Sequence, residues 1–212
     1  MLIRRIYNIL FGTFGPQHWW PGDTPLEVAI GAILTQNTSW KNVEKAIENL
    51  KREGLLDLEK LLGLSPERLK ELIRPAGFYN QKTERLRSFL LWLHKKGGCL
   101  TEINENTEKI RQELLKIKGI GKETADSILL YAMNRPVFVV DAYTKRILSR
   151  HNIISEGADY DTVQALFTNN LPLDVPLYKE YHALLVKLGK EYCRSRNPLC
   201  ETCPLKSMLM SS

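Results

Sequence analysis

The sequence has few of the patterns that predict β-strands, long apolar segments or repeats. Alternating runs of β-branched residues are missing, and the one strand candidate, PVFVVD at 136–141, is brief and leads into a helical pattern. No apolar stretch approaches the length of about 18 residues that a membrane span needs, and no internal repeat or low-complexity segment is present. These absences argue against a sheet protein, a membrane-spanning protein and a repeat protein.

Cysteines are scarce, and the excess of positive charge is modest. Three of the four cysteines lie between Cys193 and Cys203, which favours a metal site in a reducing cytoplasm over a disulfide scaffold. The 30 Lys and Arg residues against 24 Asp and Glu residues allow an anionic partner but do not require one. No long apolar core or small-residue cleavage site follows the N-terminal run MLIRRIYNILFG. We therefore expect an amphipathic helix there, a cytoplasmic protein and no membrane partner.

Helical periodicity fills most of the chain. Apolar residues recur at spacings of three and four, prolines stand near expected helix starts, and glycines stand near expected helix ends. The clearest repeats are Leu26, Ala29, Ile30, Ile33 and Leu34, and Leu86, Leu90 and Leu93. We predict an all-α protein with about nine or ten helices of ordinary length. The best candidate for a domain boundary is the break NRP at 134–136.

The stretch KGIGKETA at 118–125 predicts a tight turn between two helices. Thr107 is a suitable N-cap for a helix that ends near Lys116, and a second helix is expected from Lys122 to Met133. The two glycines permit positive φ, and the free N–H groups that start the second helix, with Lys122 beside them, form a site for a phosphate oxygen. The alternative is a glycine C-cap that binds nothing. A nucleotide P-loop is excluded because the GxxxxGK[ST] spacing is missing.

A second motif, VFVVDAYTKRIL, follows the hairpin and contains Asp141. Together the two motifs resemble the helix-hairpin-helix plus Gly/Pro-Asp signature of the endonuclease III superfamily of DNA base-excision glycosylases. LTQNTSWKNV, RPAGFYNQKTERL and the C-terminal cysteines occur in that superfamily's order and spacing, so the resemblance covers almost the whole chain. It implies that the partner is double-stranded DNA containing a damaged base. No oligomer signal is evident, and we expect a monomer.

The resemblance also implies two helical domains with the active site in a cleft between them. Residues 25–135 would form a six-helix barrel that contains the hairpin. Residues 1–24 and 136–212 would form a second domain that carries the cysteine loop.

Site residues can be carried over from the superfamily position by position. The hairpin would bind the DNA backbone through Lys118, Gly119, Gly121 and Lys122. Asp141 would be the catalytic carboxylate, because breaking an N-glycosidic bond builds positive charge on the sugar and a fixed anion stabilises it while positioning water. From the residues alone, Asp141 also suits the N-cap of the following helix, and the two roles can coexist.

Glu123 stands where bifunctional members of the superfamily carry a lysine that attacks the sugar and goes on to cut the strand. A carboxylate cannot form a Schiff base, and Lys122 points about 100° away around the helix, so we expect a monofunctional enzyme. RPAGFYNQK, the hairpin and VVD look most similar to the endonuclease III-related 3-methyladenine DNA glycosylases, which also carry glutamate at this position.

That branch places aromatic residues around the flipped base, and the matching residues here are Trp20 and Trp40. N3-alkylated adenine is cationic and already a good leaving group, so aromatic stacking and cation–π attraction suit it without a strong general acid. Glu123 and Tyr143 would border the same pocket. For both tryptophans the alternative is core or interdomain packing.

Two further polar residues carry expectations from the resemblance. Gln36, in LTQNT, corresponds to the wedge residue that fills the hole left by the extruded base, and its alternative is a capping or interhelix hydrogen bond. Arg146 lies one turn after Asp141 and would bind phosphate or orient the aspartate; a plain surface arginine is the alternative.

Cys193, Cys200 and Cys203 resemble the first three ligands of the superfamily's C-x6-C-x2-C-x5-C iron–sulfur loop. The fourth position is Leu209, whereas a [4Fe–4S] cluster ordinarily takes four cysteine thiolates. Four explanations stay open: a cluster with a non-cysteine fourth ligand, a three-iron form, a degenerating tail, or a zinc site completed by a histidine such as His182. We favour an iron–sulfur cluster with a structural role.

The sequence thus predicts a monofunctional DNA glycosylase of base excision repair, with 3-methyladenine as the favoured substrate. Two alternatives remain. One is a bifunctional endonuclease III-like glycosylase and lyase that acts on oxidised pyrimidines, and the other is a non-catalytic helix-hairpin-helix module in which Asp141 is only a cap.

Overall fold

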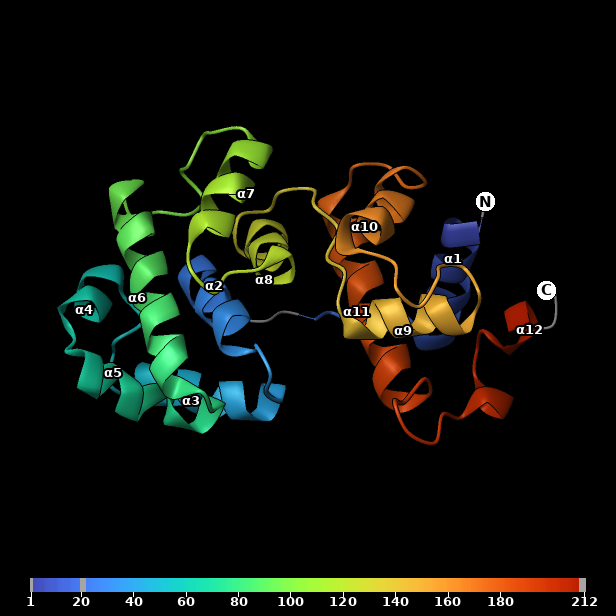
Figure 1. The fold of residues 1–212 in the computed structure, drawn as a ribbon, viewed down its shortest axis with the longest axis horizontal. Helices are drawn as coiled ribbons and strands as arrows, with labels where there is room; N and C mark the ends of the chain where they lie inside the picture. Colours follow the sequence, from blue (N-terminus) through green and yellow to red (C-terminus); the bar gives the residue numbers. More distant parts are fainter. Residues whose placement is uncertain (1, 20–21, 210–212) are drawn as a thin grey trace. The chain divides into compact units, whose positions relative to one another are not determined.

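The structure is a computed structural model that describes residues 2–19 and 22–209 (Figure 1). Within these ranges it contains twelve α-helices, one π-helical turn, two 3-10 turns and no strand, which confirms the all-α prediction. α8 (Lys122–Ser127) is the first part of the helix that was predicted from Lys122 to Met133. The helix number exceeds the predicted nine or ten because α4 (Leu58–Gly63) and α12 (Lys206–Leu209) have only six and four residues. Such lengths are too short for apolar periodicity to reveal.

The chain divides into two compact units, one formed by Trp20–Arg135 and one by Met1–Trp19 with Pro136–Ser212. None of the helices in the described part of the chain combines the length and apolar character that crossing a bilayer requires.

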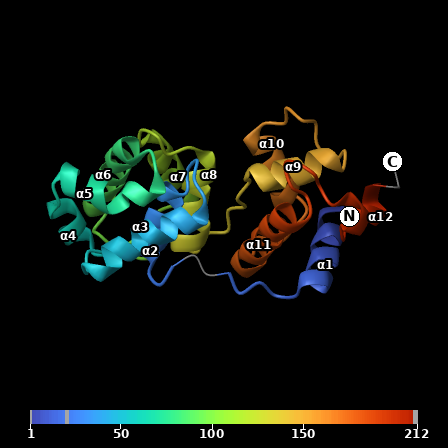
Figure 2. The same ribbon diagram turned by 90° about the horizontal axis from the view of Figure 1, so that it is seen from below.

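The unit Trp20–Arg135 is built around α2 (Pro25–Leu34). This helix is apolar on nearly every side, so it is buried among α3, α6, α8 and the π-helical turn η2 (Ile128–Ala132), and Figure 2 shows it among its neighbours. The other elements are α3 (Trp40–Arg52), α4, α5 (Pro66–Ile73), the 3-10 turn η1 (Arg74–Ala76), α6 (Tyr79–Lys95), α7 (Thr107–Lys116) and α8.

The two helices of the hairpin differ in detail from the prediction. Asn106, and not Thr107, is the N-cap of α7, because its side chain accepts a hydrogen bond from the N–H of Glu108. The predicted second helix is divided, since α8 ends at Ser127 and the chain continues as the π-helical turn η2. π-Helical turns are rare and are frequent at functional sites.

The second unit packs the N-terminal helix with the C-terminal ones. Its elements are α1 (Leu2–Phe14), α9 (Ala142–Arg150), α10 (Tyr160–Thr168), α11 (Val175–Glu191), the 3-10 turn η3 (Cys200–Thr202) and α12. The long α11 packs against both α1 and α9 (Figure 2). α1 is amphipathic as predicted, with Ile3, Ile6 and Leu10 buried, and the hydroxyl of Tyr181 donates to the carbonyl of Ile3 at 2.9 Å.

Candidate active site

Asp141 lies at the start of α9, at the end of an extended segment with residues 136–140. That segment is bound to α10, since Gln164 Nε2 donates to the carbonyl of Phe138 at 2.6 Å and the N–H of Val140 donates to the hydroxyl of Tyr160 at 3.3 Å. Asp141 Oδ1 accepts hydrogen bonds from the N–H of Thr144 at 2.7 Å and from its hydroxyl at 2.8 Å. The capping role that the sequence indicated is therefore present.

The second oxygen of this carboxylate faces α11. His182 Nε2 lies 3.5 Å from Asp141 Oδ2, and the two residues are only 5% and 8% exposed. Burial by itself raises the pKa of Asp141, but His182 and the two Thr144 groups outweigh it, so the pKa of this carboxyl lies below its ordinary value. Asp141 is consequently an anion at neutral pH, as stabilising a developing positive charge requires.

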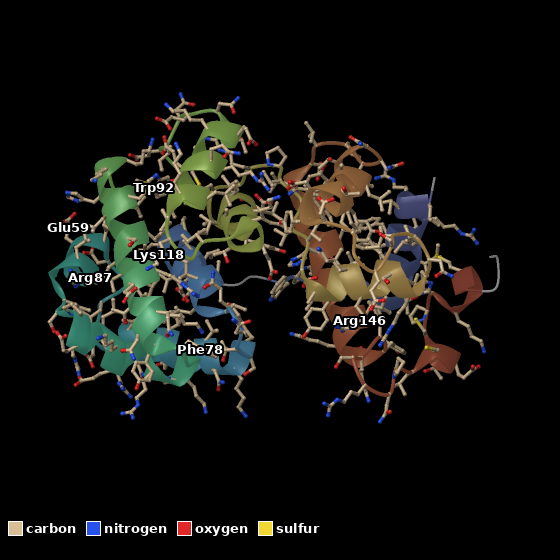
Figure 3. The ribbon with its side chains drawn as sticks, in the orientation of Figure 1. Glu59, Phe78, Arg87, Trp92, Lys118 and Arg146 are labelled. Carbon is tan, nitrogen blue, oxygen red and sulfur yellow. The ribbon has the colours of Figure 1, made fainter. Side chains whose placement is uncertain are left out.

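The tight turn of the hairpin is built around Gly119 and Ile120. Gly119 has φ +86°, which favours glycine, whereas Gly121 has φ −90° and does not use the conformation that we expected for both glycines. Ile120 is buried and fixes the turn to the core, while Lys118, Gly119 and Gly121 are exposed. The backbone of the turn thus faces solvent, and Figure 3 labels Lys118 beside it.

Gln36 is bonded to this turn. Its Nε2 donates to the carbonyl of Gly119 at 2.9 Å and to the hydroxyl of Thr124 at 2.8 Å, and Arg85 donates to its Oε1. The side chain of Arg85 packs over Gly119, where a Cβ atom would lie 2.3 Å from Arg85 Nε. The interhelix hydrogen bond that was the alternative for Gln36 is therefore what the structure contains, and the wedge role stays a prediction.

The two hairpin helices are joined by a buried ion pair. Arg111 on α7 and Asp126 on α8 form two hydrogen bonds, Nε to Oδ1 at 2.6 Å and Nη2 to Oδ2 at 3.1 Å. Asp126 is fully buried. Lys122 and Glu123 are exposed at the start of α8, one turn away from this pair.

The aromatic residues expected around a flipped base are only partly placed. Trp20 lies outside the described residues. Trp40, the first residue of α3, is half-buried with its ring against α2, where a Cβ on Gly31 would lie 3.4 Å from Trp40 Cη2. The indole therefore packs against α2 at ordinary contact distance, which is the packing alternative for Trp40, and its pocket role stays a prediction.

Phe78 is a candidate that the sequence analysis missed. It caps α6 with φ +46°, a strained conformation for a bulky residue, and it is 60% exposed. Figure 3 shows it at the N-terminal end of α6. An exposed aromatic side chain in a strained turn suits stacking on the flat ring of a ligand. The signal was available as the Gly-Phe pair in RPAGFYNQK.

Tyr143 and Arg146 on α9 pack within their own unit. Figure 3 labels Arg146. Its Nε donates to the carbonyl of Cys193 at 2.8 Å and its Nη2 to that of Gly189 at 3.1 Å, and its guanidinium lies 5.0 Å from the centre of the Tyr143 ring. Tyr143 packs against Gly189, where a Cβ would lie 2.3 Å from Tyr143 Cδ1. Binding of Arg146 to a phosphate would compete with these bonds and stays a prediction.

Three cysteines gather after α11, and none of them forms a disulfide. Burial raises the pKa of the Cys203 thiol, and the nearby Cys193 and Cys200 raise it further. Residue 209 is leucine, and the described residues contain no group of three or more His, Cys, Asp or Glu side chains arranged to hold a metal ion. These residues do not fit a cluster held by four thiolates. His182, which was considered as the fourth ligand of a zinc site, lies beside Asp141 instead.

Protein contacts shape this cysteine loop independently of any metal. Arg150 Nη1 donates to the carbonyl of Arg194 at 2.6 Å and Nη2 to that of Ser195 at 3.1 Å. Leu205 is buried after the last cysteine.

Comparison with known proteins decides the family. Residues 30–173, more than half of the chain, match the family model described as HhH-GPD superfamily base excision DNA repair protein. The chain belongs to this superfamily. It is therefore a DNA-binding DNA glycosylase of base excision repair, with the all-α fold of endonuclease III.

Two relatives at the sequence level extend over most of the chain. A protein of Methanocaldococcus jannaschii named "Putative DNA repair glycosylase MJ1434" is 53% identical over 213 residues, which cover 99% of this chain and 96% of the relative. Endonuclease III of Thermotoga maritima is 33% identical over 184 residues, 86% of this chain and 81% of the relative.

Two solved structures have the same fold. The H. pylori 3-methyladenine DNA glycosylase MagIII, bound to 1,N6-ethenoadenine, superposes with a TM-score of 0.74 at 32% identity and covers 90% of this chain and 98% of its own. A non-covalent endonuclease III–DNA complex has a TM-score of 0.82 at 22% identity, with 97% and 92% coverage.

Proposed function

We propose that this HhH-GPD glycosylase is monofunctional and removes alkylated purines, 3-methyladenine above all, from duplex DNA by hydrolysis. The observation that carries the proposal is the buried Asp141 carboxylate, which two hydrogen bonds from Thr144 hold at the start of α9. The similarity to a 3-methyladenine DNA glycosylase at 32% identity supports the substrate class.

The chemistry divides between the enzyme and the lesion. As the glycosidic bond breaks, positive charge grows on the deoxyribose, and the fixed anion of Asp141 stabilises it while orienting the attacking water. An N3-alkylated adenine is cationic and leaves readily, so no strong acid is needed at the base. Trp40 would supply stacking and cation–π attraction for that base.

Glu123 supports the monofunctional assignment. It occupies the exposed first turn of α8, where a nucleophilic amine would be needed for a Schiff base. Lys122 is the neighbouring amine, but adjacent residues of a helix point about 100° apart.

The DNA backbone would bind to the exposed turn formed by Lys118, Gly119, Gly121 and Lys122. Backbone N–H groups and lysine charge contact phosphates without reading sequence. Phe78 would contact bases at the extruded nucleotide.

A base-release screen tests the proposal on duplexes that each contain one lesion: 3-methyladenine, a hydrolytically stable ethenoadenine, or an oxidised pyrimidine. Wild type is expected to release the alkylated adenine. Asp141→Asn keeps the helix cap but loses the charge, so it should slow release by at least about 100-fold while DNA affinity stays similar. Unchanged release in this variant would overturn the catalytic role of Asp141, whereas a wild type that releases no base from any of these duplexes would favour the non-catalytic module.

Borohydride trapping on abasic-site duplexes separates the monofunctional enzyme from its bifunctional alternative. Because Glu123 cannot form an imine, we expect no covalent complex, with a bifunctional member of the superfamily as the positive control. Efficient capture of wild type that is lost in Lys122→Met would identify Lys122 as the nucleophile and establish the endonuclease III-like alternative.

A further inference from the structure

The neighbour of Asp141 on α11 has no role in the chemistry described so far. His182 is almost completely buried, and its Nε2 points to the carboxylate oxygen that Thr144 does not bind. The separation of 3.5 Å is that of an ion pair and longer than a good hydrogen bond. α9 and α11 pack along one another, so this contact belongs to a helix–helix interface rather than to a mobile loop.

The imidazole of His182 is also covered on a second side. The ring of Trp19 lies 5.6 Å from it, centre to centre. The chain before Trp19 is tied to α11, since the N–H of Gln17 donates to Glu180 Oε1 at 2.7 Å. His182 therefore lies in a built site with the carboxylate and an indole as its walls.

Other charged groups on the elements around Asp141 are engaged elsewhere. On α9, Lys145 donates to the carbonyl of Ala158, and Arg146 donates to two carbonyls at the end of α11. On α11, Glu180 accepts from Gln17. On α10, the Tyr160 hydroxyl faces the N–H of Val140 and not the carboxylate. Among the described residues, His182 is the titratable group whose charge acts on Asp141.

We propose that His182 is a positioning residue for base release, which fixes Oδ2 of Asp141 while Thr144 fixes Oδ1. The inference rests on the proposed role of Asp141. A carboxylate bound at one oxygen can still rotate about its Cβ–Cγ bond, whereas one bound at both presents its charge in a single orientation. Preorganised charge of this kind stabilises a developing cation without reorganisation.

When its ring is protonated, His182 also opposes the effect of burial on the carboxyl. Without it, burial would favour the protonated acid, which carries no charge to stabilise the sugar. His182 therefore extends catalysis to lower pH, in addition to orienting the carboxylate.

The test compares His182→Leu, which has no polar group, with His182→Gln, which keeps a neutral donor. The control is His151→Gln, the same change at a half-buried histidine of this unit that is not among the groups acting on Asp141. Two measurements are made on each: single-turnover release of 3-methyladenine from about pH 5 to pH 8, and titration of the Asp141 carboxyl by the 13C signal of labelled aspartate.

We expect His182→Leu to move the acid limb of the rate profile to higher pH, with release at about pH 5 falling at least roughly tenfold more than at pH 8. The carboxyl titration should move the same way, DNA affinity should stay unchanged, and His182→Gln should recover part of the loss. His151→Gln should leave both measurements as in wild type.

The outcomes separate this inference from the proposed function. If neither titration nor acid limb moves while only the free energy of unfolding falls, His182 is merely structural and the inference is wrong. If the titration moves but base release does not follow it, His182 acts on Asp141 as inferred, and it is the catalytic role of Asp141 that fails.

Discussion

Lys82 shows how one residue can organise the surroundings of a site without entering it. Its side chain is completely buried in α6, and Nζ donates to the carbonyls of Leu34 and Ala76, each at 2.8 Å. The first carbonyl ends α2, just before Gln36, and the second ends η1, just before the Gly77–Phe78 turn. One ammonium group thus joins the two turns that present Gln36 and Phe78.

Burying this ammonium makes stability depend on pH. Burial, with a smaller effect of Arg85, lowers the pKa of Lys82 from 10.5 to about 8. Between these values the unfolded chain binds more protons than the folded one, so the free energy of unfolding rises with pH. We predict that Lys82→Met removes a rise of roughly 1 to 3 kcal/mol between pH 8 and pH 10. Urea denaturation at each pH measures it.

The matched control is Lys95→Met, which removes an exposed lysine from the last turn of the same helix. This variant should keep the pH dependence of wild type. A parallel pH dependence in all three proteins would show that Lys82 titrates in the folded protein as it does in the unfolded chain.

At the scale of elements, the hairpin depends on the relative position of α7 and α8. The Arg111–Asp126 pair joins them inside the protein, and Gln36 joins the turn to the end of α2. The φ of +86° at Gly119 shows that the turn itself needs a glycine there. The exposed backbone of the turn is therefore a rigid surface, as binding a phosphate through N–H groups requires.

Removing one charge of this pair should be costly. Asp126→Asn removes the carboxylate charge that the buried Arg111 guanidinium binds, and we predict a loss of about 3 to 5 kcal/mol in the free energy of unfolding. Lys109 on the same helix supplies the control, because it is exposed and pairs with Glu105 just before the helix, so Lys109→Met should cost less than about 1 kcal/mol. Chemical denaturation measures both. Similar small losses would mean that the buried pair adds nothing beyond a surface contact.

For the whole molecule, patterns local in sequence predicted the fold class well. Apolar residues at spacings of three and four identified the long helices, because helical periodicity is visible in a single segment. The hairpin was located for the same reason: two glycines between helical patterns require a turn. The short helices α4 and α12 were missed, and so was the π-helical turn η2 inside the helix predicted from Lys122 to Met133, because each contains too few residues to show a period.

Contacts across the fold could not be predicted in this way. The sequence offered Gln36 two roles, and only the folded unit shows its bonds to Gly119 and Thr124. From the sequence, His182 was considered only as a histidine that could complete a zinc site. In the structure it lies beside Asp141. Nothing in YNQKTERL distinguishes the buried Lys82 from a surface lysine. Amphipathic periodicity indicates which face of a helix is buried, but it does not indicate which polar side chain on that face forms hydrogen bonds with backbone carbonyls.

The sequence by itself determined the helical architecture, the glycine turn, the aspartate at the start of a helix and the absence of a fourth cysteine at residue 209. Each of these follows from residue type and spacing within one segment. Only the tertiary structure decided which oxygen of Asp141 faces which partner, and what Gln36, Arg146 and Lys82 bind. The reason is physical: the direction of a side chain and the pKa of a buried group depend on neighbours from other helices, which packing brings together.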